Sequence, residues 1–534
     1  MTHEIGMKIG LAQIDTRIGD FAGNARRITA AVAEAGRRGA DLVVLPELVV
    51  PGYPPRDLLL DPDFVERTIA ATSDLARELA DGPPVVLGTV ARSGSATPGH
   101  PGLWNTAALL SGGRVAALAA KRLLPAYDVF HEPRWFVPGP PSEPVEIGGR
   151  RIGLLVCEDL WDEGYPVHPP AELVAAGAEM LVAISASPFR AGILPRRLHH
   201  ARRPGVPVVY LNAAGANDEL IFDGRSFVLG QDGHLLALLP GFREAVEVVD
   251  MDGPPIEATA ETPPEEELFE ALTLGVRGFA AKNGIRRLFL GLSGGVDSAV
   301  VAIIATSALG PDAVTALALP SRHTDPRSTE SARELATTLG IGFEELPIEP
   351  LHAAVDSALG SLLEGAEGGT TTDENLQARL RMLVLTAAVN HRGGLLLNTS
   401  NKTELSLGYG TLYGDLAGTL SVLGDVTKPT VYALARWATA HRAVIPPFIL
   451  DRLPTAELRP DQVDPFDYPV VSPAVEALVQ GESPPSSIPD TDTAALRRLL
   501  RLAEHKRWQH GVILKVTERA FGTGRMMPIT RSGS

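Results

Sequence analysis

The chain has 534 residues, of which 45% are hydrophobic and 21% are charged, and these ordinary globular values exclude disorder along its whole length. No apolar run approaches about 18 residues, and the first residues lack the basic and apolar regions of a secretory signal, so we expect a cytoplasmic protein without a membrane span. Lys and Arg number 48 against 64 Asp and Glu, and the net charge of −16 disfavours a nucleic-acid partner while allowing a small anionic ligand in a local pocket.

In the first half of the chain, short β-branched runs alternate with stretches of helical spacing. Mixed strands with flanking helices imply a layered α/β fold. The helices are expected at residues 24–39 and 63–80. The strands are expected at Lys8–Gln13, Leu42–Leu45, Val85–Thr89, Asn105–Leu110, Arg151–Val156, Met180–Ser185 and Val208–Asn212, followed by a hairpin of Ser226–Leu229 and His234–Leu238.

Residues 253–266 are rich in Pro and Glu and lose the apolar periodicity, which predicts a linker between domains at 1–252 and 267–534. The second half then alternates helices and strands, a rhythm typical of a doubly wound parallel sheet. Residues 360–373 are rich in Gly and Thr and are expected to form a mobile loop. The helices are expected at Glu267–Asn283, Ser298–Leu309 and Ser328–Leu339, and the strands at Arg287–Leu292, Ala313–Leu319 and Phe343–Ile348.

A glycine-rich run, Ser-Gly-Gly-Val-Asp-Ser at 293–298, joins an expected strand to an expected helix. Glycines let backbone N–H groups approach an anion, and a helix N-terminus adds positive partial charge. Ser293 and Ser298 add hydroxyl donors. Asp297 would repel a phosphate, so it is better suited to bind Mg²⁺ beside one. The alternative is a plain tight turn with a helix cap.

This run resembles the SGGxDS signature of the ATP pyrophosphatases and lacks the lysine of the GxxxxGK[ST] loop. The signature alone leaves open tRNA modification and the synthetases of GMP, asparagine, argininosuccinate and NAD. Further motifs narrow the choice, and one of them follows an expected strand at 394–398, where open sheets bind ligands. They are ENLQAR at 374–379, TSNKTE at 399–404, TLYGD at 411–415, DVTK at 425–428, LPTAEL at 453–458 and EHKR at 504–507.

In combination these motifs resemble the NAD synthetase family over about 285–530, although Ser400 stands where that family has glycine. A single lysine such as Lys428 or Lys506 would by itself be read as a solvated surface residue. The resemblance implies ATP as a co-substrate and Mg²⁺ as the metal. It implies that Gly291, Ser293, Gly294, Gly295, Val296, Asp297, Ser298, Thr399, Lys428 and Thr455 bind ATP, that Asp297 and Glu404 hold Mg²⁺, and that Asn375, Arg379, Glu404, His505 and Lys506 bind deamido-NAD.

Cys157 is the only cysteine, which excludes an intrachain disulfide and a structural zinc site made of cysteines, and fits a reducing cytoplasm. A lone cysteine is usually a small buried hydrophobe. Here it ends an apolar run, and Glu47 and Lys121 also lie beside apolar runs. A carboxylate that takes the thiol proton and an ammonium that stabilises the thiolate would make a nucleophilic set. Spacing alone does not show whether the three side chains meet.

The segments LPEL with GY at 45–53, KRLLPAY at 121–127 and VCED at 156–159 resemble the carbon–nitrogen hydrolase (nitrilase) superfamily, and most closely the glutamine-amidase domain of glutamine-dependent NAD synthetases. The resemblance covers about 7–250 and implies a four-layer αββα sandwich. It implies Glu47 as general base, Lys121 as the oxyanion and thiolate partner, Cys157 as nucleophile and Glu132 as the residue that orients the lysine, with Tyr127, Ser187 and Tyr53 around glutamine.

One position departs from the amidase pattern SPFxxG[KR], because Ile193 stands where a basic residue is expected. Arg190, Arg196 and Arg197 are the candidates to replace it. Alternatively, backbone groups and Tyr127 hold glutamine, or the glutaminase activity is lost.

The two resemblances together imply a two-site amidotransferase with an ATP-pyrophosphatase-type, Rossmann-like second domain. Its partners would be small molecules, namely deamido-NAD, ATP and glutamine or ammonia, and its family implies a homo-oligomer with a sheltered passage for ammonia. The first alternative is an ATP pyrophosphatase that amidates another acid. The second is a nucleotide sensor without catalysis, against which the intact candidate residues argue.

Overall fold

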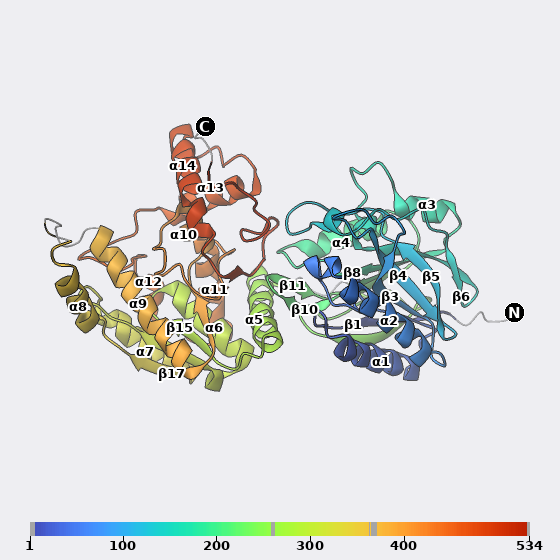
Figure 1. Ribbon diagram of the computed structural model, residues 1–534, viewed down its shortest axis with the longest axis horizontal. Coiled ribbons are helices and arrows are strands. Elements are labelled where there is room, and N and C mark those ends of the chain that lie inside the picture. The colour runs from blue at the N-terminus through green and yellow to red at the C-terminus, as the bar shows by residue number, and fades with distance from the viewer. Residues whose placement is uncertain (1–5, 258–261, 363, 365–370, 531–534) are drawn as a thin grey trace. The chain divides into compact units, whose positions relative to one another are not determined.

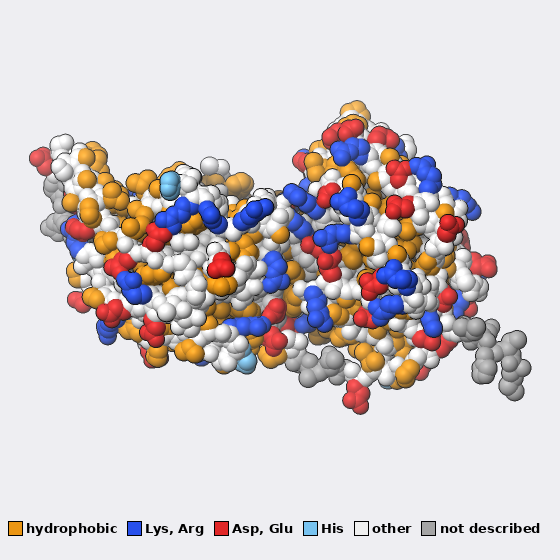
Figure 2. Space-filling model, turned by 90° about the horizontal axis from the view of Figure 1, so that it is seen from below, with side chains coloured by type: hydrophobic (Ala, Val, Ile, Leu, Met, Phe, Trp, Pro, Cys, Tyr) orange, Lys and Arg blue, Asp and Glu red, His pale blue; other side chains and the backbone are white. Residues whose placement is uncertain are grey.

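The computed structural model describes residues 6–257, 262–362, 364 and 371–530. The chain divides into two compact units, Met1–Glu261 and Thr262–Ser534, and each has its own sheets (Figure 1). Within the described ranges, no helix is both long and apolar enough to cross a membrane. Figure 2 shows Lys, Arg, Asp and Glu side chains on the surface of both units.

The first unit contains two six-stranded sheets, in the orders β14-β1-β2-β3-β4-β5 and β13-β12-β9-β8-β7-β6, and a two-stranded ribbon of β10 and β11. Its elements are β1 (Lys8–Gln13), α1 (Phe21–Arg37), β2 (Leu42–Val44), η1 (Arg56–Leu60), α2 (Pro62–Glu78), β3 (Val85–Arg92), β4 (Leu103–Ser111), β5 (Arg114–Ala120), η2 (Glu132–Arg134), β6 (Val145–Ile147), β7 (Arg150–Val156), η3 (Cys157–Leu160), α3 (Pro169–Ala175), β8 (Met180–Ser185), α4 (Ile193–Arg202), β9 (Val208–Asn212), β10 (Ala214–Asn217), β11 (Leu220–Asp223), β12 (Phe227–Leu229), β13 (Leu235–Leu238) and β14 (Ala245–Asp250).

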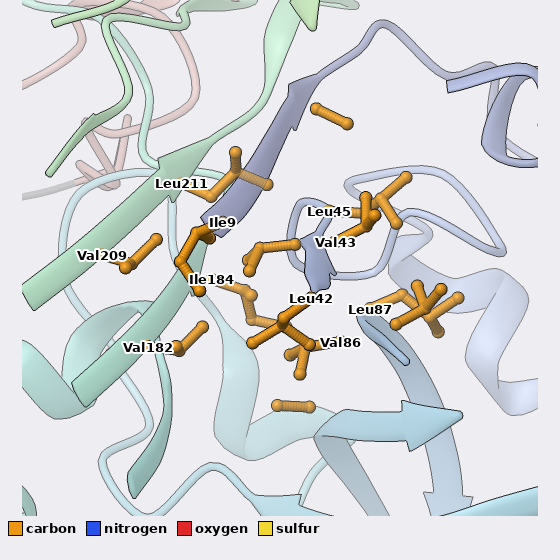
Figure 3. Close-up of a cluster of buried hydrophobic side chains, with 14 of the residues drawn as sticks. Ile9, Leu42, Val43, Leu45, Val86, Leu87, Val182, Ile184, Val209 and Leu211 are labelled. Atoms are coloured by element: carbon orange, nitrogen blue, oxygen red, sulfur yellow. The ribbon is translucent and has the colours of Figure 1, made fainter. Parts of the chain in front are cut away.

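The two large sheets pack face to face, and helices cover their outer faces. Side chains of β1, β2 and β3, such as Ile9, Leu42 and Val86, share one buried cluster with Val182 and Ile184 of β8 (Figure 3). Helices α1 and α2 contact the first sheet, while α3 and α4 contact the second. Because both faces of these central strands are covered, their sequences are nearly continuous apolar runs. The predicted four-layer αββα sandwich is confirmed.

The second unit contains one six-stranded sheet in the order β17-β16-β15-β18-β19-β20, and every neighbouring pair is parallel. Its elements are α5 (Pro264–Lys282), β15 (Leu288–Gly291), α6 (Val296–Leu309), η4 (Pro311–Ala313), β16 (Val314–Ala318), α7 (Pro326–Leu339), β17 (Gly342–Glu345), α8 (Glu349–Leu359), α9 (Thr371–Arg392), β18 (Leu395–Asn398), α10 (Lys402–Leu407), β19 (Leu420–Ser421), α11 (Lys428–His441), α12 (Pro447–Asp451), α13 (Tyr468–Gln480), α14 (Asp490–Arg507) and β20 (Val512–Ile513).

This strand order confirms the predicted doubly wound sheet. The order reverses between β15 and β18, and open sheets bind ligands at the carboxyl ends of the strands at such a point. Two local predictions differ from the structure. Helix α5 begins at Pro264, within the expected linker, and Thr371–Asp373 belong to α9 instead of a loop, because acidic residues stabilise a first helical turn. Of the expected mobile loop, residues 363 and 365–370 lie outside the described residues.

Candidate functional site

Cys157 lies where β7 ends, at the first residue of η3. Its φ is 45°, in the left-handed region that residues other than glycine rarely adopt. A backbone held in this region at a strand end is typical of a reactive side chain that a sharp turn presents. The thiol is free and the residue is only 6% exposed, so the turn directs it into the interior of the first unit.

A buried lysine joins two carboxylates beside this cysteine. Lys121 Nζ donates to Glu47 Oε1 at 2.9 Å and to Glu132 Oε1 at 2.6 Å. Glu47 Oε1 also accepts from Asn105 Nδ2 at 2.7 Å, and Glu47 Oε2 accepts from the backbone N–H of Ala186 at 2.9 Å. Glu47 follows β2 and Lys121 follows β5, so strand ends of the first sheet bring the two side chains together. Asn105, in β4, was not predicted as a site residue.

The electrostatics of this cluster keep the thiol protonated. Burial raises the pKa of Cys157 well above its usual value, the Glu47 charge raises it further, and Lys121 lowers it. Burial also opposes the charged lysine, but Glu132 and Glu47 outweigh it and raise the pKa of Lys121. Burial raises the pKa of Glu132, against the pull of Lys121. A neutral thiol next to an ammonium needs a base to become a nucleophile. Two carboxylates accept from Lys121, those of Glu47 and Glu132, and the charges of both raise the pKa of the thiol.

Tyr127 and Tyr53 differ in their exposure to solvent. The Tyr127 ring is 53% exposed, and its hydroxyl donates to Glu158 at 3.0 Å, which also accepts from Tyr165 at 2.9 Å. Tyr53 is buried, and burial together with the Glu47 charge raises the pKa of its hydroxyl. Glu158 follows the cysteine in the VCED motif, and two tyrosine hydroxyls donate to it; the motif does not predict it as a site residue.

Ser187 is held by side chains behind it. Its N–H donates to Asn212 Oδ1 at 2.8 Å, and Arg197 donates to its carbonyl at 2.9 Å and to its hydroxyl oxygen at 3.2 Å. Arg197 is completely buried and also pairs with both oxygens of Asp223 at 2.9 Å. Arg197 is one of the three arginines that could replace the basic side chain expected at position 193. It contacts Ser187, but its guanidinium also forms a salt bridge with Asp223.

Gly88 fixes the position of Glu47. A Cβ at residue 88 would lie 2.1 Å from the backbone nitrogen of Leu48 and 2.5 Å from Cα of Glu47. We expect Gly88→Ala to destabilise the protein by about 1–3 kcal/mol. On the prediction that Glu47 is the base of a glutamine amidase, we also expect it to reduce glutamine hydrolysis by about 100-fold, because a displacement of roughly 1 Å has that effect on a catalytic group. Urea unfolding and a glutaminase assay measure the two effects. Gly82→Ala is the control, since its Cβ would meet only one carbonyl at 3.5 Å; equal behaviour of both variants would contradict the prediction.

In the second unit, the glycine-rich loop joins β15 to α6. Gly294 has φ 77°, and a Cβ there would lie 2.4 Å from the carbonyl oxygen of Ser328, so only glycine fits. The Ser298 hydroxyl donates to Gly295 O at 3.0 Å, and the Ser293 hydroxyl accepts from the Gly295 N–H at 3.3 Å. These bonds fix the shape of the loop before α6, whose N-terminus is a place where backbone N–H groups attract an anion.

A pocket opens at this loop, between the carboxyl ends of β15 and β18. Of the residues predicted to bind ATP, Gly294 is the one that does not line it. Those that do are Gly291, Ser293, Gly295, Val296, Asp297, Ser298, Thr399, Lys428 and Thr455, and Glu404 lines it as well. Arg381 and Arg452 also line the pocket and were not predicted, since arginines outside the motifs carry no distinguishing signal.

Lys428 links the two predicted metal ligands. Its Nζ lies 2.5 Å from Asp297 Oδ2 and 3.0 Å from Glu404 Oε1. Asn401 Nδ2 donates to Asp297 Oδ1 at 2.9 Å, while Asn401 Oδ1 accepts the N–H of Glu404 at 3.1 Å and caps α10. Burial raises the pKa of Glu404, against the pull of Lys428. Two carboxylates close enough to share one cation beside an anion-binding loop are a donor set that fits Mg²⁺.

The other residues predicted to bind deamido-NAD lie outside the lining of this pocket. Asn375 Oδ1 accepts from the Thr411 hydroxyl at 2.6 Å, and Arg379 Nε donates to Leu412 O at 3.1 Å. Lys506 Nζ donates to the carbonyls of residues 408 and 410, at 2.8 and 2.7 Å. Three of the predicted residues thus hold one segment, 408–412, and His505 is exposed on α14.

Two family models match the chain, the carbon-nitrogen hydrolase model over residues 8–261 and the NAD synthase model over residues 268–509. The glutamine-dependent NAD(+) synthetase of Synechocystis sp. is 39% identical, and the alignment covers 98% of each chain. The synthetase of the same description from Rhodobacter capsulatus is 40% identical, again over 98% of each chain. The chain belongs to the glutamine-dependent NAD(+) synthetase family. The predicted fusion of an amidase-type unit with an NAD synthase unit is confirmed.

Solved structures of glutamine-dependent NAD(+) synthetases agree with this family. The synthetase of Acinetobacter baumannii, in complex with ADP, is 31% identical, and the superposition covers 98% of each chain with a TM-score of 0.78. The synthetase of Cytophaga hutchinsonii superposes with a TM-score of 0.82 over 99% of this chain and 98% of its own, and at 22% identity it shows the shared fold alone.

Proposed function

We propose that the chain converts deamido-NAD to NAD with ATP and takes the nitrogen from glutamine. One observation carries the proposal: a single chain holds both the cluster of Glu47, Lys121 and Cys157 and a nucleotide-type pocket at the switch point of a doubly wound sheet. Residues 1–252 would act as the glutamine amidase, residues 253–266 as the linker and residues 267–534 as the synthetase.

At the first site, the Glu47 carboxylate takes the thiol proton of Cys157, and the sulfur attacks the amide carbonyl of glutamine. Lys121 stabilises the thiolate and the oxyanion that forms. Ammonia leaves with the proton that Glu47 took from the thiol. Water then hydrolyses the glutamyl thioester to glutamate, and its second proton returns to the sulfur. Glu132 holds the lysine in place, and the ion pairs at 2.9 and 2.6 Å support this division of roles.

The residues proposed to bind glutamine come from separate segments of the first unit. Tyr127 and Tyr53 bring a phenol each, and the Ser187 hydroxyl accepts from Arg197. Because that contact occupies only a lone pair of the oxygen, the hydroxyl can also donate one hydrogen bond, either to the neighbouring Tyr210 oxygen or to an oxygen of the substrate. This arrangement supports glutamine binding without a basic residue at Ile193.

At the second site, the nicotinate carboxylate of deamido-NAD attacks the α-phosphate of ATP, and pyrophosphate leaves. Ammonia attacks the resulting acyl-adenylate and gives NAD and AMP. The phosphates would lie at the start of α6, with contacts from Thr399, Lys428 and Thr455. Within the 293–298 loop, the N–H groups of Ser293 and Gly295 donate to the hydroxyls of Ser298 and Ser293. Asp297 and Glu404 would hold Mg²⁺, which when bound neutralises charge on the phosphates.

The site for deamido-NAD is proposed at Asn375, Arg379, Glu404, His505 and Lys506. The hydrogen bonds between three of these residues and segment 408–412 support a rigid wall beside the pocket: Arg379 and Lys506 donate to it, and Asn375 accepts from it. Ammonium is no nucleophile, so a sheltered passage between the sites would preserve free ammonia. A homo-oligomer and a cytoplasmic location complete the proposal, and the unpaired, buried Cys157 is consistent with a reducing compartment.

Release of pyrophosphate from ATP tests this assignment. We expect release with deamido-NAD and Mg²⁺ to exceed release with other carboxylates by at least about 100-fold, since a site built for a polar substrate rejects acids that leave its groups unpaired. Deamido-NAD labelled with ¹⁸O in its carboxylate should transfer one labelled oxygen to AMP. Faster release with a different acid would favour the alternative ATP pyrophosphatase, and unlabelled AMP would rule out the acyl-adenylate.

A further inference from the structure

Asp159 lies two residues after Cys157, and its carboxylate accepts three backbone hydrogen bonds. Its Oδ1 accepts from the N–H groups of Arg122 and Leu123, both at 2.9 Å. Its Oδ2 accepts from the N–H of Val156 at 3.1 Å. The residue is 3% exposed, so water does not compete for these bonds. All three donors belong to the backbone, which makes the carboxylate a rigid bridge between two chain segments.

The two bridged segments carry the chemistry of the first site. Val156 directly precedes Cys157, and Arg122 directly follows Lys121. The cysteine turn needs such support, because its φ of 45° is unfavourable for a residue with a side chain. Lys121 leaves the first sheet at the end of β5, whereas Cys157 leaves the second sheet at the end of β7. A single side chain therefore holds the exits of the two sheets at a fixed separation.

We propose that Asp159 is a positioning residue that fixes the distance between the Lys121 ammonium and the Cys157 sulfur. The inference rests on the proposed amidase function, and it assigns to Asp159 no contact with substrate. Loss of the bridge would let the lysine move away from the sulfur, and the thiolate would lose the charge that stabilises it. The catalytic consequence is a slower chemical step, while glutamine binding changes little.

The single cysteine of the chain makes a direct test possible, because iodoacetamide can label a thiol only at Cys157. Asp159→Asn keeps the shape of the side chain and replaces one acceptor oxygen with an NH₂ group that faces backbone N–H. We expect alkylation at pH 7.5 to slow by about tenfold, as expected when the thiolate loses its cationic partner. If the variant acted only by removing a negative charge, the alkylation rate would change in the opposite direction: the pKa of the thiol would fall, and alkylation would become faster.

Kinetics on the same variant separate positioning from general damage. We expect kcat for glutamine hydrolysis to fall by about 100-fold with KM within about threefold, because misplacement by roughly 1 Å costs that much. NAD formation with ammonium chloride should stay within about twofold. Asp162→Asn is the matched control: Asp162 is 5% exposed and pairs with His168 and Arg203 instead of the Lys121 segment.

Asp159→Glu keeps the charge and lengthens the side chain by one methylene, so we expect the variant protein to fold. Its kcat for glutamine hydrolysis should still fall about tenfold, because the longer side chain moves the bridged segments apart. The proposal would be overturned if either Asp159 variant kept the wild-type alkylation rate and the wild-type kcat. Faster alkylation would overturn it too, as would a fall in kcat no larger than that of Asp162→Asn. If wild-type protein failed to hydrolyse glutamine, the proposed function would fail, whereas the alkylation rates would still decide whether Asp159 positions the thiol.

Discussion

Replacing Cys157 with alanine is expected to abolish NAD formation from glutamine and to leave formation from ammonium chloride unchanged. The sulfur is the proposed nucleophile of the first site, and loss of a nucleophile lowers the rate by a factor on the order of 10⁴ or more. The second site holds no cysteine, because Cys157 is the only one in the chain. Parallel assays of NAD formation with the two nitrogen donors measure the effect.

Alkylated wild-type protein supplies the control for this variant. Iodoacetamide has one thiol to modify, so full alkylation should reproduce the variant's behaviour, with glutamine use lost and ammonium use kept. Loss of both activities in the variant and in the alkylated protein would contradict the assignment of separate sites. Retained glutamine use in both would contradict the role of the thiol.

Asp297→Asn is expected to lower the rate of NAD formation from either nitrogen donor by a factor on the order of 10² to 10³. Losing one electrostatic contact to the transition state has an effect of this size. The carboxylate lies 2.5 Å from Lys428 and lines the pocket beside the glycine-rich loop. An amide there is a poorer ligand for Mg²⁺. Glutamine hydrolysis should persist, because Asp297 belongs to the second compact unit and Cys157 to the first.

The Mg²⁺ dependence of the Asp297→Asn variant separates a metal ligand from a structural residue. The concentration of Mg²⁺ that gives half-maximal NAD formation from ammonium chloride should rise by at least about tenfold. Asp312→Asn, at an exposed carboxylate in the same unit, should leave it unchanged. An unchanged Mg²⁺ dependence of the Asp297 variant would contradict its role as a ligand.

The apolar runs of the sequence were sufficient to predict the layered architecture of both units. Lys8–Gln13, Met180–Ser185 and Val208–Asn212 are strands with the predicted bounds, because buried central strands are continuous apolar runs. Strands without that signal were missed. Ala214–Asn217 has no β-branched residue, and Leu420–Ser421 and Val512–Ile513 are only two residues long, so tertiary pairing alone defines them.

The candidate residues, and the pairing of Glu132 with Lys121, could be named from the motifs, but partners outside the motifs, such as Asn105 and Asn401, could not. Glu47 and Lys121 end different strands of one sheet and Cys157 ends a strand of the other, so only the packed sandwich brings them together. The same holds for Asn401, whose amide joins Asp297 to the cap of α10. Side-chain partnerships of this kind depend on the relative placement of elements, which periodicity and spacing do not encode.

The transfer of the amide nitrogen of glutamine tests the central claim most directly. Wild-type protein is incubated with deamido-NAD, ATP, Mg²⁺ and glutamine labelled with ¹⁵N in the amide, and the mass of the NAD formed is measured. The account predicts NAD that carries one ¹⁵N with wild-type protein and no NAD with Cys157→Ala. No NAD from labelled glutamine, while ammonium chloride supports its formation, would contradict the claim that this chain draws its nitrogen from glutamine.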